Sequence, residues 1–367
     1  MATEKKRSVA KRETPEKSLS PRQRRVEKIR ALQDLRKSKV ITYVTSTRAN
    51  YEVQMALDVV RYVYEHLRHI ERERKNGPQN IDLFIHSNGG DGTVPWRLVT
   101  LVREYTKHFS VLVPNRAFSA ATLTALGANE VVMHPMGVLG PTDATVSNAF
   151  NPADPFNPQR KLGISVEDVT AYFQLVRDDA GIQHEDEFVQ AFNQLATQVH
   201  PLALGNVKRS ISQSRLMARK LLSLHMGADK AHDIDQIVEN LTSKSFYHGH
   251  PINRVEARDQ VGLPTVKDAS KEVEAAMWSL FEEYEDELRL NQPFDPALEF
   301  GKAVDTSAMN VGVTQRSPDS SNNLVFVESE YESYVNADKY YLNGTMQPNG
   351  ALNVGLFYTY RGWSKED

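Results

Sequence analysis

Hydrophobic and polar residues change period several times along the chain, and from residue 40 to about residue 133 these changes predict strands and helices in turn. Short β-branched or apolar runs, each ended by a turn signal, predict strands at 40–45, 81–86 and 109–113. Between them, apolar residues recur at the spacing of one helix face, which predicts helices over about 56–74 and 94–107. Such alternation is typical of a parallel sheet with right-handed crossovers. The sequence therefore predicts an α/β fold.

Two turns that follow successive predicted strands carry the residues of most chemical interest. Gly89 and Gly90 follow the second strand, and Ser119 follows the third, where a small-residue segment from 119 to 127 predicts a tightly packed helix. Turns that follow parallel strands emerge at the same edge of a sheet, where open α/β sheets place their sites. We therefore expect the two turns to face each other.

Ser119 lies at a predicted strand-to-helix turn. A side chain at such a turn points out of the sheet end, and the free N–H groups and positive dipole end of the following helix favour an anion beside it. An acyl-transfer nucleophile needs this environment. The alternative is that Ser119 only caps the helix, because serine is a common cap. A reciprocal capping box would have Glu or Gln at position 122, where the chain has Thr.

The glycine pair suits the same chemistry. Residues without a Cβ atom let a substrate chain approach the backbone closely, and the peptide N–H groups of Gly89 and Gly90 can then point at a developing oxyanion. The N–H group of Ala120, directly after Ser119, is a further candidate donor. The alternative is an ordinary tight turn. A diglycine paired with a serine-headed helix favours the oxyanion hole.

Three segments resemble the serine dehydrogenase proteinase family, which is related to signal-peptide peptidase A and to the wider Clp protease and crotonase fold. They read HSNGGDGTVPW, VLVPNRAFSAATLTALGANEVVM and GVLGPTDA, and the resemblance extends over about Val40 to Val266. It implies a spiral of βαβ units with added helices, and assembly into rings or stacked homo-oligomers. By this resemblance, Ser119 matches the nucleophile and Gly89–Gly90 the oxyanion loop.

The base that would activate Ser119 departs from the Ser-His-Asp pattern. Clp-type enzymes place a histidine after the next strand, in the neighbourhood that here is Val138-Leu139-Gly140-Pro141. His134 comes earlier, and we expect it to pack or to be solvated at a turn. Relatives of the signal-peptide peptidase type use a lysine, whose amine acts as a base at neutral pH when burial lowers its pKa.

Two lysines are candidates for this base. Lys208 lies in a helix predicted over about 202–224, at the edge of its apolar stripe. Lys161 lies in a Pro- and Asn-rich loop over 148–163 that could fold over the site. For each lysine the alternative is a solvated charge whose stem covers apolar surface. We place Lys208 first and keep Lys161 open.

The chain divides by composition into three parts. Residues 1–37 form a basic arm that we expect to be flexible, with eleven Lys or Arg against four Glu up to residue 30. Residues 38–290 form the predicted hydrolase domain. Residues 291–367 read as a linker followed by a small β-rich appendage, with short strands at 324–327, 340–342 and 354–360. The arm is either a solvated tail or a weak contact for nucleic acid or an acidic partner.

Composition excludes several classes of site. The chain has 367 residues and no cysteine, so disulfides and thiolate metal sites are absent, as suits a reducing compartment. His248 and His250 are accompanied by no HExxH motif and no evident carboxylate partner, so they do not predict a zinc site, and we expect no cofactor and no metal. No apolar run approaches the length of a membrane span or a signal peptide, so we expect a cytoplasmic protein.

These observations favour a serine peptidase acting on peptides or proteins. Ser119 would attack the carbonyl, a lysine would accept its proton, and the N–H groups of Gly89, Gly90 and Ala120 would hold the oxyanion. No ATPase motif accompanies the site, so any unfolding of substrates would come from a partner. A crotonase-like acyl-thioester enzyme and a catalytically silent oligomeric scaffold are the alternatives.

Overall fold

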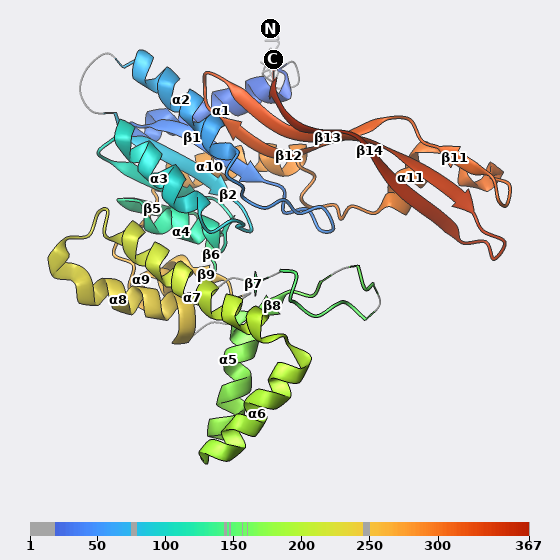
Figure 1. The fold of residues 1–367 in the computed structure, drawn as a ribbon. Coiled ribbons are helices and arrows are strands. Elements are labelled where there is room, and N and C mark those ends of the chain that lie inside the picture. Colours follow the sequence, from blue (N-terminus) through green and yellow to red (C-terminus); the bar gives the residue numbers. More distant parts are fainter. Residues whose placement is uncertain are drawn as a thin grey trace, which may run out of the picture.

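The computed structural model describes residues 19–74, 79–142, 145–146, 148–155, 157–159, 161–244 and 250–366. Its centre is a sheet in the order β10-β5-β3-β2-β1-β12-β13, in which β11 and β14 both pair with β13 (Figure 1). Five strands run parallel: β10 (Val266–Asp268), β5 (Glu130–Met133), β3 (Phe109–Val113), β2 (Ile81–His86) and β1 (Lys39–Thr45). The predicted parallel α/β sheet is confirmed for its first three strands.

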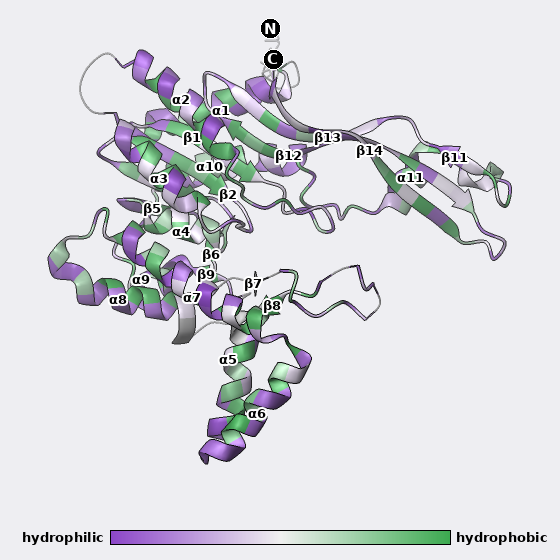
Figure 2. Ribbon diagram, in the orientation of Figure 1, coloured by the Kyte–Doolittle hydropathy of each residue, from purple (hydrophilic) through white to green (hydrophobic). Residues whose placement is uncertain are grey.

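Helices cover both faces of this sheet. On one face lie α1 (Pro21–Arg36) and α10 (Lys271–Glu287), and on the other lie α2 (Val59–Arg72), α3 (Val94–Tyr105) and α4 (Ala120–Leu126). Strand β1 shows how the sequence achieves this, since Val40 and Val44 pack with α1 and α10 whereas Ile41 and Tyr43 pack on the opposite side. Strands buried on both faces are hydrophobic almost throughout, as the green central strands of Figure 2 illustrate.

The helix-rich middle of the chain lies beside α4. The long helix α7 (Pro201–Leu222) packs against α4 and against α8 (Ala231–Glu239). Small pairings complete this region, with β4 (Arg116–Ala117), β6 (Val138–Leu139) and β9 (Ile252–Asn253) in one sheet and β7 (Thr145–Val146) with β8 (Ile164–Ser165) in another. Helix α9 (Arg254–Asp259) follows β9. None of the helices in the described ranges is both long and apolar enough to cross a bilayer.

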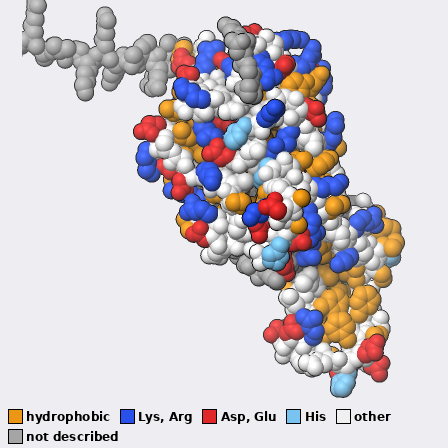
Figure 3. Space-filling view, turned by 90° about the vertical axis from the view of Figure 1, so that its left-hand side faces the viewer, with side chains coloured by type: hydrophobic (Ala, Val, Ile, Leu, Met, Phe, Trp, Pro, Cys, Tyr) orange, Lys and Arg blue, Asp and Glu red, His pale blue; other side chains and the backbone are white. Residues whose placement is uncertain are grey.

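A helical hairpin projects from the body. It consists of α5 (Val166–Gln174), a π-helical turn (Leu175–Asp179) and α6 (Glu185–Gln198) (Figure 1). None of the α6 residues is buried, and hydrophobic side chains gather on this projection in the space-filling view (Figure 3). Leu175, Val189 and Phe192 are exposed there. The hairpin therefore presents an apolar surface that the rest of the chain leaves uncovered.

The basic arm predicted over 1–37 is wrong in its second half. Residues 21–36 form α1, which begins with a capping box at Ser20 and packs on α10. Its central Arg25 is fully buried, with its Nε atom 2.7 Å from Glu328 Oε2. Lys28 likewise pairs with Glu283 of α10 at 2.5 Å. Side chains that we expected to face solvent or an external partner are thus used inside the fold. Residues 1–18 lie outside the described ranges.

The C-terminal region is an extension of the main sheet and not a separate appendage. Strand β12 (Ser320–Glu328) pairs antiparallel with β1, and β13 (Ser333–Met346) and β14 (Leu352–Glu366) continue from it as a long hairpin (Figure 1). The segment expected to be a linker contains α11 (Pro296–Ala303) and β11 (Thr314–Arg316). The predicted strands exist, but their pairing with β1 joins two regions that are far apart in sequence.

Replacing Arg25 by alanine is expected to lower the free energy of unfolding by about 3–5 kcal/mol, because the buried Glu328 would lose its charged partner. Arg30 on the same helix is the control, since its side chain is 58% exposed and its pairing with Glu330 is of the surface type. We expect Arg30→Ala to change stability by less than about 1 kcal/mol. Urea denaturation of both variants measures the difference, and equal effects would contradict the role given to Arg25.

Candidate active site

Ser119 lies at a strained strand-to-helix turn. The chain leaves β3, forms the short β4, and reaches Ser119 at the N-cap position of α4 with φ 50° and ψ −112°. Positive φ is unfavourable for a residue with a Cβ atom, and such strain is retained where the surrounding structure enforces it. The Ser119 side chain makes no capping hydrogen bond to α4. The alternative that the hydroxyl serves as a helix cap is therefore not what the structure shows.

Backbone hydrogen bonds join this turn to the glycine loop after β2. The Ser87 N–H donates to Arg116 O, and the Phe118 N–H donates back to Ser87 O, both at 3.0 Å. A side chain of α4 adds a second tie, because the Thr122 hydroxyl lies 2.7 Å from Ala117 O and accepts from the Gly140 N–H at 3.1 Å. The turn that bears Ser119 is thus held by the loop before it and by the segment after β6.

Gly89 makes the closest contact between the two turns. A Cβ atom on this residue would lie 2.5 Å from Phe118 O, 2.8 Å from Ser119 Cβ and 2.9 Å from Ala120 N, and its φ is +90°. Only glycine fits such a position without displacing the backbone. The glycine loop and the serine turn therefore face each other, as the sheet topology predicted.

The three predicted oxyanion donors differ in availability. The Gly89 N–H donates to Ser87 Oγ at 3.0 Å, so it is occupied within its own loop. Gly90 pairs with Met55 through the N–H groups of Met55 and Asp91, which directs the Gly90 N–H away from Met55. Within the described ranges, neither the Gly90 nor the Ala120 N–H has a hydrogen-bond acceptor. These two backbone N–H groups are the remaining candidate donors, and Gly90 lines the same pocket as Ser119.

The segment that carries Met55 is bonded to residues that follow α10 in the sequence. Tyr51 donates its hydroxyl proton to the buried Asp338 of β13. The Phe294 N–H donates to Ala49 O at 2.9 Å. Arg48, which is also buried, donates from Nε to Gln292 O at 2.6 Å. The strand-like pairing that orients Gly90 is therefore supported by residues from the other end of the chain.

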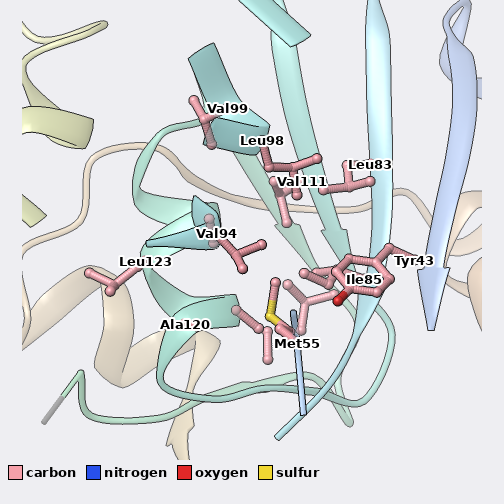
Figure 4. Packing of buried hydrophobic residues seen from close by; sticks show 14 of the residues in the cluster. Tyr43, Met55, Leu83, Ile85, Val94, Leu98, Val99, Val111, Ala120 and Leu123 are labelled. Atoms are coloured by element: carbon pink, nitrogen blue, oxygen red, sulfur yellow. The ribbon is translucent and has the colours of Figure 1, made fainter. Parts of the chain in front are cut away.

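A pocket of about 230 Å³ opens beside Ser119. Its walls come from the glycine loop, α4, the segment after β6 and α7, and its lining residues are Gly90, Asp91, Gly92, Ser119, Leu123, Thr142, Ser210, Gln213 and Ser214. The packing beneath it is hydrophobic, and Figure 4 shows Ala120 of α4 beside Met55. Ser119 thus lines a small cavity at the edge of the main core.

Neither predicted lysine lines this pocket. Lys208 is exposed on α7 and stands two residues before the lining Ser210, which is about 200° around the helix. Lys161 is exposed, next to a bridge between its own backbone and that of Ala153. The described part of the pocket wall contains no lysine and no histidine. The structure brings Ser119, Gly90 and Ala120 together and leaves both lysines outside.

The histidines named from the sequence have other partners. His134 stacks on Trp278 of α10 with ring centroids 5.0 Å apart and accepts from the Met136 N–H, and burial lowers its pKa. This agrees with the expectation that it packs at a turn. His250 lies 2.9 Å from Glu256, a carboxylate that the sequence did not point to, and His248 lies outside the described residues.

Sequence reasoning missed the polar wall of the pocket. Ser210 and Ser214 stand four residues apart, so they share one face of α7, and Gln213 lies between them on that face. Thr142 belongs to the GVLGPTDA segment, but its chemistry was not singled out. The sequence signal for this wall was the group of polar residues Ser210, Gln213 and Ser214 on a helix that also carries an apolar stripe.

Gly89→Ala should disrupt the turn that bears Ser119, because the new methyl group would meet backbone atoms at 2.5 Å and the residue would keep a positive φ. We expect a loss of several kcal/mol of stability, or a local opening of this turn. The control is Gly205→Ala on α7, where a Cβ atom meets open space and should stabilise the helix by up to about 1 kcal/mol. Thermal unfolding and amide hydrogen exchange at 117–122 measure both variants. An unperturbed Gly89→Ala protein would contradict the contact.

Comparison with known proteins gives weak individual matches. An uncharacterized protein of Methanocaldococcus jannaschii is 26% identical over 271 residues, with 72% of this chain and 80% of that protein covered. A second uncharacterized protein of this organism is 25% identical over 172 residues, and the match covers 47% of each chain.

Solved structures are more distant still. A probable enoyl-CoA hydratase/isomerase from Mycobacterium abscessus matches at 13% identity and a TM-score of 0.29, with 72% of this chain and 77% of that chain covered. A mutant of the 1510-N membrane-bound stomatin-specific protease, in complex with a substrate peptide, matches at 9% identity and a TM-score of 0.25, with 66% and 99% covered.

The family assignment rests on a match to a protein family as a whole and not to a single protein. Residues 14–198, half of the chain, match the ClpP-like SDH-type serine proteinases. This span includes the glycine loop, the turn that bears Ser119, and the segment after β6 that contributes Thr142 to the pocket. The chain belongs to the family of ClpP-like SDH-type serine proteinases.

Proposed function

We propose that this protein hydrolyses peptide bonds with Ser119 as the nucleophile. Ser119 Oγ attacks the carbonyl carbon, and its proton passes to a base as the C–O bond forms. The carbonyl oxygen takes up the electron pair, and the tetrahedral intermediate then breaks its C–N bond and releases the amine with a proton. Water cleaves the resulting ester by the same steps in reverse order. Family membership supports a serine peptidase of this kind.

One observation carries this proposal: a hydroxyl that makes no cap bond stands beside two backbone N–H groups without acceptors. The close contact of Gly89 with Ser119 and Ala120 supports a common site for the hydroxyl and the Ala120 N–H, and the pocket joins Ser119 to Gly90. We assign the oxyanion to Gly90 and Ala120, and give Gly89 the role of letting the two turns meet. Donors of this kind each contribute about 10²–10³ in kcat.

The base in this proposal is a lysine amine. Lys208 and Lys161 are the candidates, and both are exposed outside the pocket. For either to act, its amine has to enter the pocket, through movement of its own segment or from a second copy of the chain. The lysine step is thus independent of the assignment of Ser119 and is tested separately.

The pocket also bears on the two alternative functions. Its volume of about 230 Å³ is below the range of roughly 300–1,000 Å³ that is usual for small-molecule and cofactor sites, so it favours one peptide side chain over a coenzyme A thioester. The alternative of a catalytically silent scaffold is supported by the absence of lysine and histidine among the described lining residues. Labelling of Ser119 decides between this scaffold and the peptidase.

We also propose that the protein forms a homo-oligomer. The support is the projecting hairpin, where Leu175 is exposed in the π-helical turn and Val189 and Phe192 are exposed on α6, a helix without buried residues. Exposed apolar patches of this kind mark interaction sites in water-soluble assemblies.

Ser119→Ala should abolish modification by a fluorophosphonate probe and lower peptidase activity by about 10⁴–10⁶-fold, as removal of a serine nucleophile does. Intact-protein mass spectrometry, followed by peptide mapping, measures the adduct. The control is Ser212→Ala, an exposed serine of α7 whose hydroxyl donates to Lys208 O, and it should be labelled normally. Failure of the unaltered protein to form an adduct on Ser119 would favour the silent scaffold.

Lys208→Ala and Lys161→Ala test the base. The variant that loses the base should be labelled about 10²–10⁴-fold more slowly, because general-base assistance contributes this factor. Arg209→Ala is the matched control on α7, since it removes a neighbouring exposed cation. Full labelling rates in both lysine variants and in the double variant would exclude these lysines and leave the role of Ser119 intact.

A further inference from the structure

We propose that the pocket beside Ser119 binds the side chain on the acyl side of the cleaved bond and selects a short, uncharged polar residue: Ser, Thr, Asn or Gln. This inference rests on the proposed function. The side chain of the acyl-side residue is attached to the α-carbon, which is bonded to the attacked carbonyl carbon. A pocket that contains Ser119 and Gly90 is therefore within reach of that side chain.

Size limits the occupant to one side chain. The cavity measures about 230 Å³ and is bounded by α4 on one side and α7 on the other. Its only large apolar lining residue in the described ranges is Leu123, which is itself buried. Hydrophobic subsites are lined mainly by apolar and aromatic groups, and this wall lacks them.

The remaining wall offers hydroxyl and amide groups. Ser214 donates from Oγ to Thr142 O at 2.7 Å, so its oxygen keeps lone pairs to accept a hydrogen bond. Ser210 and Gln213 lie on the same face of α7 and add a donor and an acceptor each. A side chain with both a donor and an acceptor matches this set better than a hydrocarbon does.

Thr142 supplies an independent observation that points to a ligand. Thr142 is only 2% exposed, and its Oγ1 atom is buried with no hydrogen-bond partner among the residues that the structure describes. Buried polar groups without partners are rare in folded proteins, because the lost hydrogen bonds to water are not replaced. Because Oγ1 has almost no accessible surface in the empty pocket, the Thr142 side chain has to turn toward a polar side chain that enters, which then supplies the missing partner.

Charge excludes ionised side chains. Asp91 is exposed at the pocket, and its Oδ1 atom already accepts from the Thr93 N–H at 2.8 Å and the Thr93 hydroxyl at 2.7 Å. This carboxylate repels an acidic side chain. A lysine or arginine side chain would meet one carboxylate, that of the exposed Asp91, whose Oδ1 atom is already bonded to Thr93, and it would lose water against a wall whose other groups are neutral. The site therefore favours neutral polar residues.

The experiment uses peptidyl diphenyl phosphonates that differ only in the side chain next to phosphorus: Thr, Gln, Ala, Leu and Lys. The rate of adduct formation on Ser119 is measured by mass spectrometry, with a small alkyl fluorophosphonate as the baseline. We expect the Thr and Gln reagents to react about tenfold faster than the Ala and Leu reagents, since sites built for hydrogen bonding discriminate strongly against groups that lack them. The Lys reagent should also react slowly.

Variants of Thr142 connect the preference to its hydroxyl. In Thr142→Val the ratio of Thr to Leu labelling should fall below about threefold. Thr142→Ser keeps the hydroxyl and should keep the ratio, which separates a binding role from a folding defect. The control is Thr197→Val on α6, where the hydroxyl is exposed and bonded to Gln194 O.

The outcomes separate this inference from the proposed function. If the small fluorophosphonate labels Ser119 but the Leu or Lys reagent is preferred, or no phosphonate reacts, the selectivity inference fails and the serine nucleophile stands. If the small probe does not label Ser119 either, the proposed function fails and the inference fails with it. A preference for Thr and Gln that persists in Thr142→Val would overturn the role of Thr142.

Discussion

The pairing of Ser87 with the backbone around Ala117 is the constraint on which the candidate site depends. Two backbone hydrogen bonds between Ser87 and residues 116 and 118 place the end of one strand against the turn that follows the next. The absence of a side chain at Gly89 then allows the turn at Ser119 to approach within contact distance. A strained serine conformation survives here because neighbouring backbone enforces it on both sides. This close approach sets Ser119 and the Ala120 N–H beside the glycine loop, whereas the pairing with Met55 orients the Gly90 N–H.

Local sequence pattern was sufficient for the part of the fold that surrounds this approach. Strands β1, β2 and β3 and their helices follow from hydrophobic periodicity, because each packs against its chain neighbours. The hydrophobic pattern did not predict contacts between elements that are distant in sequence. Strand β12 was recognised, yet nothing local shows that it pairs with β1 almost 300 residues away. Helix α1 was taken for a solvated arm because its interior contains Arg25, and only the tertiary fold supplies the buried Glu328 that makes this placement favourable.

The candidate site likewise has a part that the sequence predicted and a part that depends on tertiary contacts. Ser119, Gly90 and Ala120 could be placed because the carboxyl edge of a parallel sheet is a property of topology. The orientation of α7 is not such a property. Its apolar stripe identified an edge position for Lys208, but which side of that stripe faces Ser119 depends on how α7 lies across α4, and the structure turns Ser210 and Ser214 toward the pocket. The occupied Gly89 N–H was likewise invisible in sequence, since it depends on the rotamer of Ser87.

Strands β12 and β13 hold the segment from Arg48 to Met55 through Asn322 and Asp338, and Met55 in turn orients Gly90. The β13–β14 hairpin contributes no residue to the described pocket wall, yet it is coupled to the pocket through this segment. Evolutionary loss of these strands would therefore also remove the support of the segment that orients Gly90. A shorter relative that keeps the diglycine and the serine would have to stiffen the same segment by other means, so the length of this region and the rigidity of the loop should vary together across the family.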